Sequence, residues 1–180
     1  MKNIFFIIAM GLFSFLFGAC SKEQPTSPPP SSNAAAKADA EKLVNSLLPF
    51  AKQMLQEHHE FFPFGGKMAP DGKIGQDAAS DGTEHPASQA LIDLLRQAHQ
   101  AEARAQKIRV CATIYDIRTI PPGRTQKQDA IAAAIDHVSG YSVVLIFPYT
   151  FDAQKNLQVE PHFAMEGAHE IFPHPPQSTK

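Results

Sequence analysis

Apolar side chains recur at spacings of three and four residues in the segment that follows residue 37. The positions that form this stripe are Leu43, Leu47, Phe50 and Met54, with Val44, Leu48, Ala51 and Leu55 beside them. The spacing predicts an amphipathic helix. Because Pro49 cannot donate a backbone hydrogen bond to the carbonyl four residues earlier, we expect this helix to kink or to restart there.

A second helix is expected after His85-Pro86, since proline suits a first helical turn. Its predicted buried face consists of Ala87, Ala90, Leu91, Leu94, Leu95, Ala98 and Ala101. Between the helices, the turn signal of residues 69–72 divides Phe61 to Met68 from Lys73 to Asp77, which predicts a hairpin. The aromatic run at 61–64, followed by Gly65-Gly66, is interpreted as a core strand with a bulge, the alternative being an aromatic recognition patch.

The last part of the chain alternates between apolar and other side chains with a period of two, which is typical of strands. The segments with this pattern are 107–120, 130–138, 141–149 and 157–163. Pro121-Pro122-Gly123 ends the first, and Ser139-Gly140 forms a tight turn before the third. The alanine-rich stretch from Asp129 to Ile135 has a helix as its alternative, because alanine has the highest helix propensity.

The elements therefore follow one another as α-β-β-α-β-β-β-β. Because consecutive strands joined by short turns pair with their neighbours, we predict an α+β fold, an antiparallel sheet of about five to six strands with two helices on one face. This order is similar to that of roadblock and profilin-like domains, which are mostly binding platforms. An order of elements alone defines no function.

The chain opens with an apolar run from Ile4 to Ala19 that follows Lys2 and stops at Cys20. A membrane-spanning helix needs roughly 20 apolar residues, and this run is shorter. A positive charge, an apolar stretch and small residues at its end are the features of an export signal. We therefore predict that residues 1–19 are a signal peptide, with a retained signal anchor as the alternative.

Phe17-Gly18-Ala19-Cys20 resembles the lipobox of bacterial lipoproteins, although Phe17 occupies a place that is usually leucine. The resemblance implies that the Cys20 thiol is acylated, that residues 1–19 are removed, and that the new amino terminus receives a further acyl chain. Two or more chains give stable membrane anchoring. In diderm bacteria, Ser21 after the cysteine implies sorting to the outer membrane, on its periplasmic face.

Residues 20–36 are rich in proline, serine and small side chains, which predicts a tether, and residues 173–180 predict a short disordered tail. The remaining residues 37–172 suffice for a single domain. The chain has 43% hydrophobic residues and a formal net charge of -2. We therefore expect an ordinary globular protein without a nucleic-acid partner.

Four segments of the domain are similar to those of a group of uncharacterised bacterial α+β proteins: Glu57 to Gly65, Asp81 to Leu95, Tyr115 to Arg118 and Ser139 to Tyr149. The resemblance supports the domain boundaries and implies no activity.

Cys111 is the candidate nucleophile. If the turn at residues 121–124 pairs Arg118 with Ala130, antiparallel pairing brings Cys111 opposite His137, and a close histidine lowers the pKa of a thiol. A register shifted by one residue places the two on opposite faces. The alternative is a small core side chain without an internal disulfide partner, because Cys20 is consumed by lipid.

Candidate metal ligands gather in His162, Glu166 and His169, near Glu170 and His174. Glu166 and His169 have the one-turn spacing that lets two side chains of a helix share an ion. The glycine between them and the flanking prolines oppose a helix, and the zinc-hydrolase signature is absent. We therefore predict no metal site and no cofactor.

Asp116 and Arg118 fall on one strand face and are candidates for ligand binding or for an ion pair at the rim. The sequence contains no glycine-rich phosphate loop, serine nucleophile elbow or paired-carboxylate signature, which favours a protein that is not an enzyme. We predict a lipid-anchored binding or accessory module that works through its sheet face or hairpin loops, with a protein as one class of partner. Two alternatives stay open: an envelope enzyme that uses Cys111 with His137, and an immunity-type protein that binds a toxin.

Overall fold

The structure, a computed structural model, describes residues 32–172. The expected signal peptide, the acylated Cys20, most of the expected tether and the C-terminal tail lie outside the described residues. Within the described part, no helix has both the length and the hydrophobicity needed to cross a membrane.

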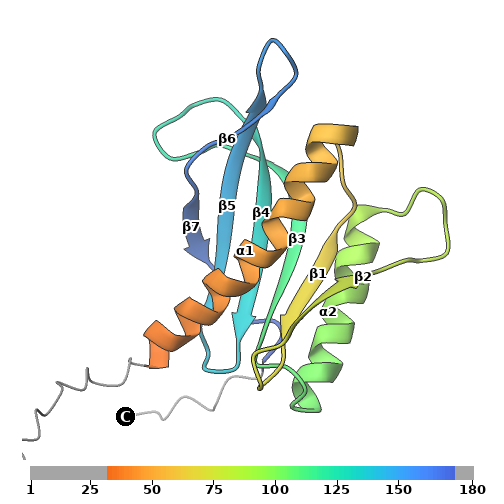
Figure 1. Cartoon of the computed structure of the whole chain (residues 1–180), viewed down its shortest axis with the longest axis vertical. Coiled ribbons are helices and arrows are strands. Elements are labelled where there is room, and N and C mark those ends of the chain that lie inside the picture. Colours follow the sequence, from red (N-terminus) through yellow and green to blue (C-terminus); the bar gives the residue numbers. More distant parts are fainter. Residues whose placement is uncertain (1–31, 173–180) are drawn as a thin grey trace, which may run out of the picture.

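Two helices and one antiparallel sheet make up the described residues (Figure 1). In chain order, the elements are α1 (Ser32–His58), β1 (Phe64–Met68), β2 (Ile74–Ala78), α2 (Ser88–Arg104), β3 (Val110–Thr119), β4 (Gln128–His137), β5 (Ser142–Phe151), β6 (Leu157–Val159) and β7 (Phe163–Glu166). The strands are arranged β2-β1-β3-β4-β5-β6, and β7 also pairs with β5. The predicted α+β class, the antiparallel sheet and the order of elements are confirmed, with seven strands in place of five to six.

The helices lie on opposite faces of the sheet, so the prediction that both cover one face is wrong. The two glycines of β1, Gly65 and Gly66, show which helix covers each face of the sheet. A Cβ atom on Gly66 would meet Leu47 of α1, whereas one on Gly65 would meet Leu95 and His99 of α2. Because successive residues of a strand point to opposite faces, the sheet separates α1 from α2 (Figure 1).

The same glycines do not form the expected bulge. The pairing of β1 with β2 and with β3 continues without interruption through both positions. Gly65 and Gly66 are glycines because a helix approaches the strand closely on each side.

α1 is a single helix that runs through Pro49, without the expected restart. Pro49 and Asn45, whose carbonyl loses its helical partner, are both exposed, so water can satisfy that carbonyl. The helix begins at Ser32, inside the stretch predicted as a tether, and Ala36 is fully buried. The domain therefore starts about five residues earlier than the sequence predicts.

The main core fills the space between α1 and the sheet. It contains Leu43, Leu47 and Leu55 from α1, with Met68, Ile114, Ile131, Ile135 and Phe147 from the strands. The alanine-rich segment is strand β4, as predicted, and pairs with β3 on one side and β5 on the other. Pairing on both sides outweighs the helix propensity of its alanines.

Candidate functional site

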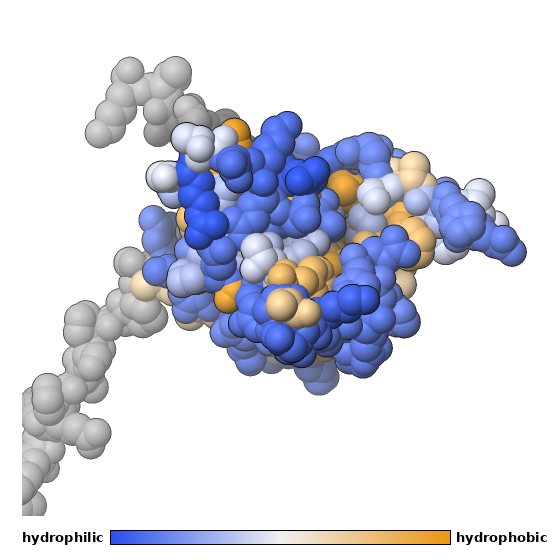
Figure 2. Space-filling model, turned by 90° about the horizontal axis from the view of Figure 1, so that it is seen from above, coloured by the Kyte–Doolittle hydropathy of each residue, from blue (hydrophilic) through white to orange (hydrophobic). Residues whose placement is uncertain are grey.

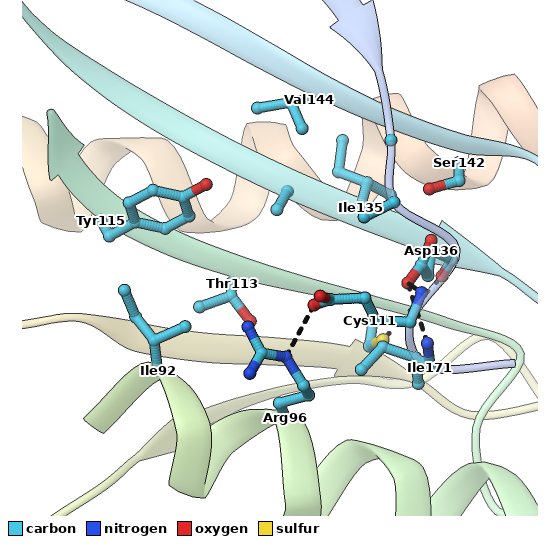
Figure 3. Close-up of a pocket in the computed structure, with 14 residues that line it drawn as sticks. Ile92, Arg96, Cys111, Thr113, Tyr115, Ile135, Asp136, Ser142, Val144 and Ile171 are labelled. Carbon is cyan, nitrogen blue, oxygen red and sulfur yellow. Dashed lines mark hydrogen bonds and ion pairs between the residues drawn. The ribbon is translucent and has the colours of Figure 1, made fainter. Parts of the chain in front are cut away.

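A pocket of about 220 Å³ lies on the α2 face of the sheet and is the candidate site (Figure 3). We call it the α2-side pocket. It exists because α2 packs against β1 and β3 and leaves the neighbouring part of this face without a helix. Its walls come from α2, from β3, β4 and β5, and from the C-terminal segment 167–171. The side chains that shape it are Ile92, Arg96, Cys111, Thr113, Tyr115, Ala134, Val144 and Ile171.

The segment 167–171 closes one side of the pocket and is held by charged groups. The Asp136 carboxylate accepts backbone N–H bonds from Glu170 and Ile171, at 3.0 and 3.1 Å. Arg96 Nε donates to the Glu170 carboxylate at 2.6 Å, and the Gln100 amide donates to the Glu170 carbonyl at 2.8 Å. We call this segment, residues 167–171, the strap. It connects α2 to β4 over the pocket.

Three polar groups in the pocket keep hydrogen-bonding capacity. Arg96 uses Nε for Glu170 and Nη1 for Asp93, at 2.6 Å each, which leaves N–H groups of the guanidinium available. Within the described residues, no hydrogen bond engages the hydroxyl of Thr113 or of Tyr115. Burial raises the pKa of the Tyr115 hydroxyl, so this group is a neutral donor and acceptor.

Cys111 contributes a buried thiol to this pocket. Burial, with the negative charge of Asp136 as the next cause, raises its pKa far above the usual value. The Sγ atom is 3.9 Å from the backbone oxygen of Asp136. A buried thiol that stays protonated is a poor nucleophile.

The predicted pairing of Cys111 with His137 is wrong by one residue. The structure pairs Cys111 with Asp136 and Val110 with His137, which places Cys111 on the α2 face and His137 on the α1 face. This register keeps Ile114, Ile131 and the other large apolar side chains of β3 and β4 together under α1, and a one-residue slip would turn them outward. The structure therefore does not bring together the two residues on which the envelope-enzyme alternative was built.

His137 instead stabilises one end of the domain. Its Nδ1 atom lies 2.8 Å from the Ser139 hydroxyl and accepts the Ser139 backbone N–H at 3.0 Å, and Nε2 lies 3.4 Å from Asp39 of α1. Asp39 also accepts a bond from Arg109 at 2.7 Å. Burial lowers the pKa of His137. These contacts fasten the first part of α1 to the sheet.

Asp116 and Arg118 do not pair with each other. The Tyr149 hydroxyl donates to Asp116 at 3.1 Å, and Arg118 pairs with Asp129 at 2.9 Å. Asp129 is the direct cross-strand neighbour of Arg118, whereas Tyr149 reaches Asp116 from β5, on the far side of β4. Burial raises the pKa of Asp116. Neither side chain belongs to the α2-side pocket.

The candidate metal ligands do not converge. The His162 ring packs against Phe147 with centroids 5.0 Å apart, Glu166 ends β7, and His169 belongs to the strap. Among residues 32–172, no three His, Cys, Asp or Glu side chains are arranged to hold a metal ion.

Sequence reasoning missed a charged network beneath α2. Lys67 of β1 lies 2.9 Å from Asp77 of β2 and 2.7 Å from Glu102 of α2, and Asp77 lies 3.2 Å from His99. The His99 side chain is 1% exposed, and its Nδ1 atom has no partner. Burial lowers the pKa of His99. The one signal in the sequence is that His99 occupies the helix stripe of Leu91 and Leu95.

Comparisons of the chain with protein-family models, with curated proteins and with solved structures found no match.

Proposed function

We propose that the protein is a lipid-anchored envelope protein whose periplasm-facing domain binds a small ligand in the α2-side pocket. The observation that supports binding is the combination of a preformed hollow with three polar groups that keep hydrogen-bonding capacity. Small-molecule sites are typically concave, mostly apolar and supplied with a few such groups. The raised thiol pKa of Cys111 supports binding over covalent chemistry.

The charges around the pocket favour an uncharged ligand. Arg96 is the positive group of the pocket, and it pairs with the carboxylates of Asp93 and Glu170. The carboxylate of Asp136 lies at the pocket as well. An anion would add to this negative excess. The spare N–H groups of Arg96 and the two hydroxyls instead suit a carbonyl or hydroxyl oxygen on a compact apolar molecule. A cavity of 150 Å³ holds benzene, so about 220 Å³ suits a molecule only somewhat larger.

The anchor accounts for the N-terminal sequence. Cys20 stands twelve positions before Ser32, where α1 begins. At about 3.1 Å per residue, an extended chain of this length reaches roughly 37 Å. Acylation of Cys20 would therefore hold the domain near the bilayer while leaving the pocket accessible.

Two experiments test the two parts of the proposal. Metabolic labelling with an alkyne fatty acid in a diderm bacterium should label the wild-type protein and retain it in the outer-membrane fraction, whereas a Cys20→Ala variant should be unlabelled and not anchored. An unlabelled wild type that keeps residues 1–19 would contradict the anchor.

The pocket is tested with a library of small neutral fragments by ligand-observed NMR. The Ala134→Phe substitution places a ring in the pocket and should abolish the fragment signals. Ala38→Phe, on the exposed side of α1, is the matched control and should leave them unchanged. Fragments that bind the wild type and both variants equally would contradict a ligand site at this place.

A further inference from the structure

β2 is an edge strand with hydrogen-bonding groups directed outward. It pairs with β1, and no other strand of the described residues lies on its second side. The Met68 carbonyl accepts the Arg109 N–H on the β3 side, and Ala69 N–H donates to Lys73. Because antiparallel residues alternate between the two directions, the backbone N–H groups of Ile74, Gln76 and Ala78 point away from β1.

An aromatic pocket of about 380 Å³ adjoins the end of this strand, on the α1 face. Its lining includes Phe50, Phe61, Phe62, Phe64 and Ala78. Phe62 is 53% exposed and Phe50 is 39% exposed, which is unusual for side chains of this size. Seen from above, apolar surface is present on the side of the projecting 79–87 loop, between hydrophilic areas (Figure 2).

The surroundings of this aromatic pocket are acidic. The segments 50–64 and 78–87, which line the pocket and continue from it, carry four carboxylates, Glu57, Glu60, Asp81 and Glu84, against one lysine, Lys52. All four carboxylates are exposed. A partner with positive charge is therefore attracted to this end of the molecule.

We infer that β2 and the aromatic pocket together bind an extended, cationic segment of a partner protein. The segment adds a strand to the free edge of β2, and main-chain hydrogen bonds to residues 74, 76 and 78 give affinity. One of its apolar side chains enters the aromatic pocket beside Ala78, and its basic side chains face the acidic rim. This inference is independent of the small-ligand pocket on the opposite face of the sheet.

A second copy of the chain fits this surface less well. Pairing two β2 strands in parallel would bring two acidic rims together, and like charges oppose such an approach. Antiparallel pairing would set each rim beside the 69–73 turn of the other copy, whose Lys73 is already paired with Asp71. An extended segment suits both features when one apolar side chain enters the pocket and the neighbouring basic side chains, with their long flexible stems, reach the carboxylates around it.

The probe for the test is a fluorescein-labelled peptide, Lys-Val-Lys-Phe-Lys-Val-Lys, with a glutamate-for-lysine peptide as its counterpart. The lysine peptide should bind, with an anisotropy change that weakens as salt is added, and the glutamate peptide should not. Phe62→Ser should weaken binding about tenfold. Met165→Ser, an equally exposed apolar position at 54% on β7, is the matched control and should bind as the wild type does.

Amide hydrogen exchange of the complex tests the edge pairing directly. The amides of Ile74, Gln76 and Ala78 should exchange quickly in the free protein and become protected by the lysine peptide. Gly75 and Asp77, whose amides face β1, are internal references that should not change. The inference is overturned if the lysine peptide does not bind below about 1 mM, or if both serine variants lose peptide affinity equally. It is also overturned if the amides of residues 74, 76 and 78 stay unprotected in the complex, or if sedimentation shows that β2 pairs with a second copy of the chain.

Discussion

The close approach of α1 to β1 at Gly66 gives the sharpest test of the helix-sheet-helix arrangement. A Cβ atom at Gly66 would lie 2.5 and 2.6 Å from the two methyl carbons of Leu47. Side-chain carbons in a packed interior are about 3.5–4.0 Å apart, so Leu47 or the helix must move. Leu47 is 1% exposed, and it has no open space to enter. Gly66→Ala therefore overpacks the main core.

Overpacking a core by a single group typically costs about 1–3 kcal/mol. For a domain of this size, a loss of 1 kcal/mol lowers Tm by about 2–4 °C, so we expect a decrease of roughly 2–12 °C. The matched control is Gly75→Ala on the adjacent strand. A Cβ there would make only ordinary contact with Lys67, at 3.8 Å, and we expect a change within about 0.5 kcal/mol.

Urea unfolding of the domain, followed by circular dichroism, measures both variants. A double-mutant cycle with Leu47→Ala isolates the contact. Leu47→Ala alone should cost about 2–5 kcal/mol, and adding Gly66→Ala should then cost little, because the clashing methyl groups are gone. If Gly66→Ala is as stable as Gly75→Ala, or if the two losses are simply additive, α1 does not lie against β1 as described.

Three further outcomes follow from the structure. Burial holds the pKa values of His99 and His137 below their value in the unfolded chain, so the unfolded state takes up protons first as pH falls below about 6.5. The free energy of unfolding, measured by urea titration, should therefore decrease from pH 7.5 to 5.5. A constant or rising free energy would contradict the burial of these histidines. Iodoacetamide should modify the Cys111 thiol no faster than the native protein opens, as followed by mass spectrometry. Rapid alkylation under native conditions would contradict the burial of this thiol. Asp136→Ala removes the acceptor of two strap amides and should cost about 1–3 kcal/mol with faster exchange at Glu170 and Ile171; unchanged exchange would show that the strap is held by other contacts.

The α2-side pocket was beyond prediction from the sequence, although its parts were not. The strands that carry Thr113, Tyr115 and Ala134 were predicted from alternation, and the helix that carries Arg96 from its apolar stripe. Their meeting depends on sheet order and register. The strap is held by Asp136, which in the sequence is one more polar residue of a strand. Its carboxylate accepts the strap amides only because the fold brings Glu170 and Ile171 beside it.

The helices, the strands and the antiparallel connectivity followed from the periodicity and the turn residues, because both are local properties of the chain. The sequence left the face of each helix and the register of β3 with β4 undecided, since a strand with apolar residues on both sides permits either arrangement. Tertiary packing settled both. Gly65 and Gly66 allow one helix to pack closely on each side of β1. Burial of the large β3 and β4 side chains under α1 fixes the register, which places Cys111 and His137 on opposite faces of the sheet. The α2 face is left with a pocket.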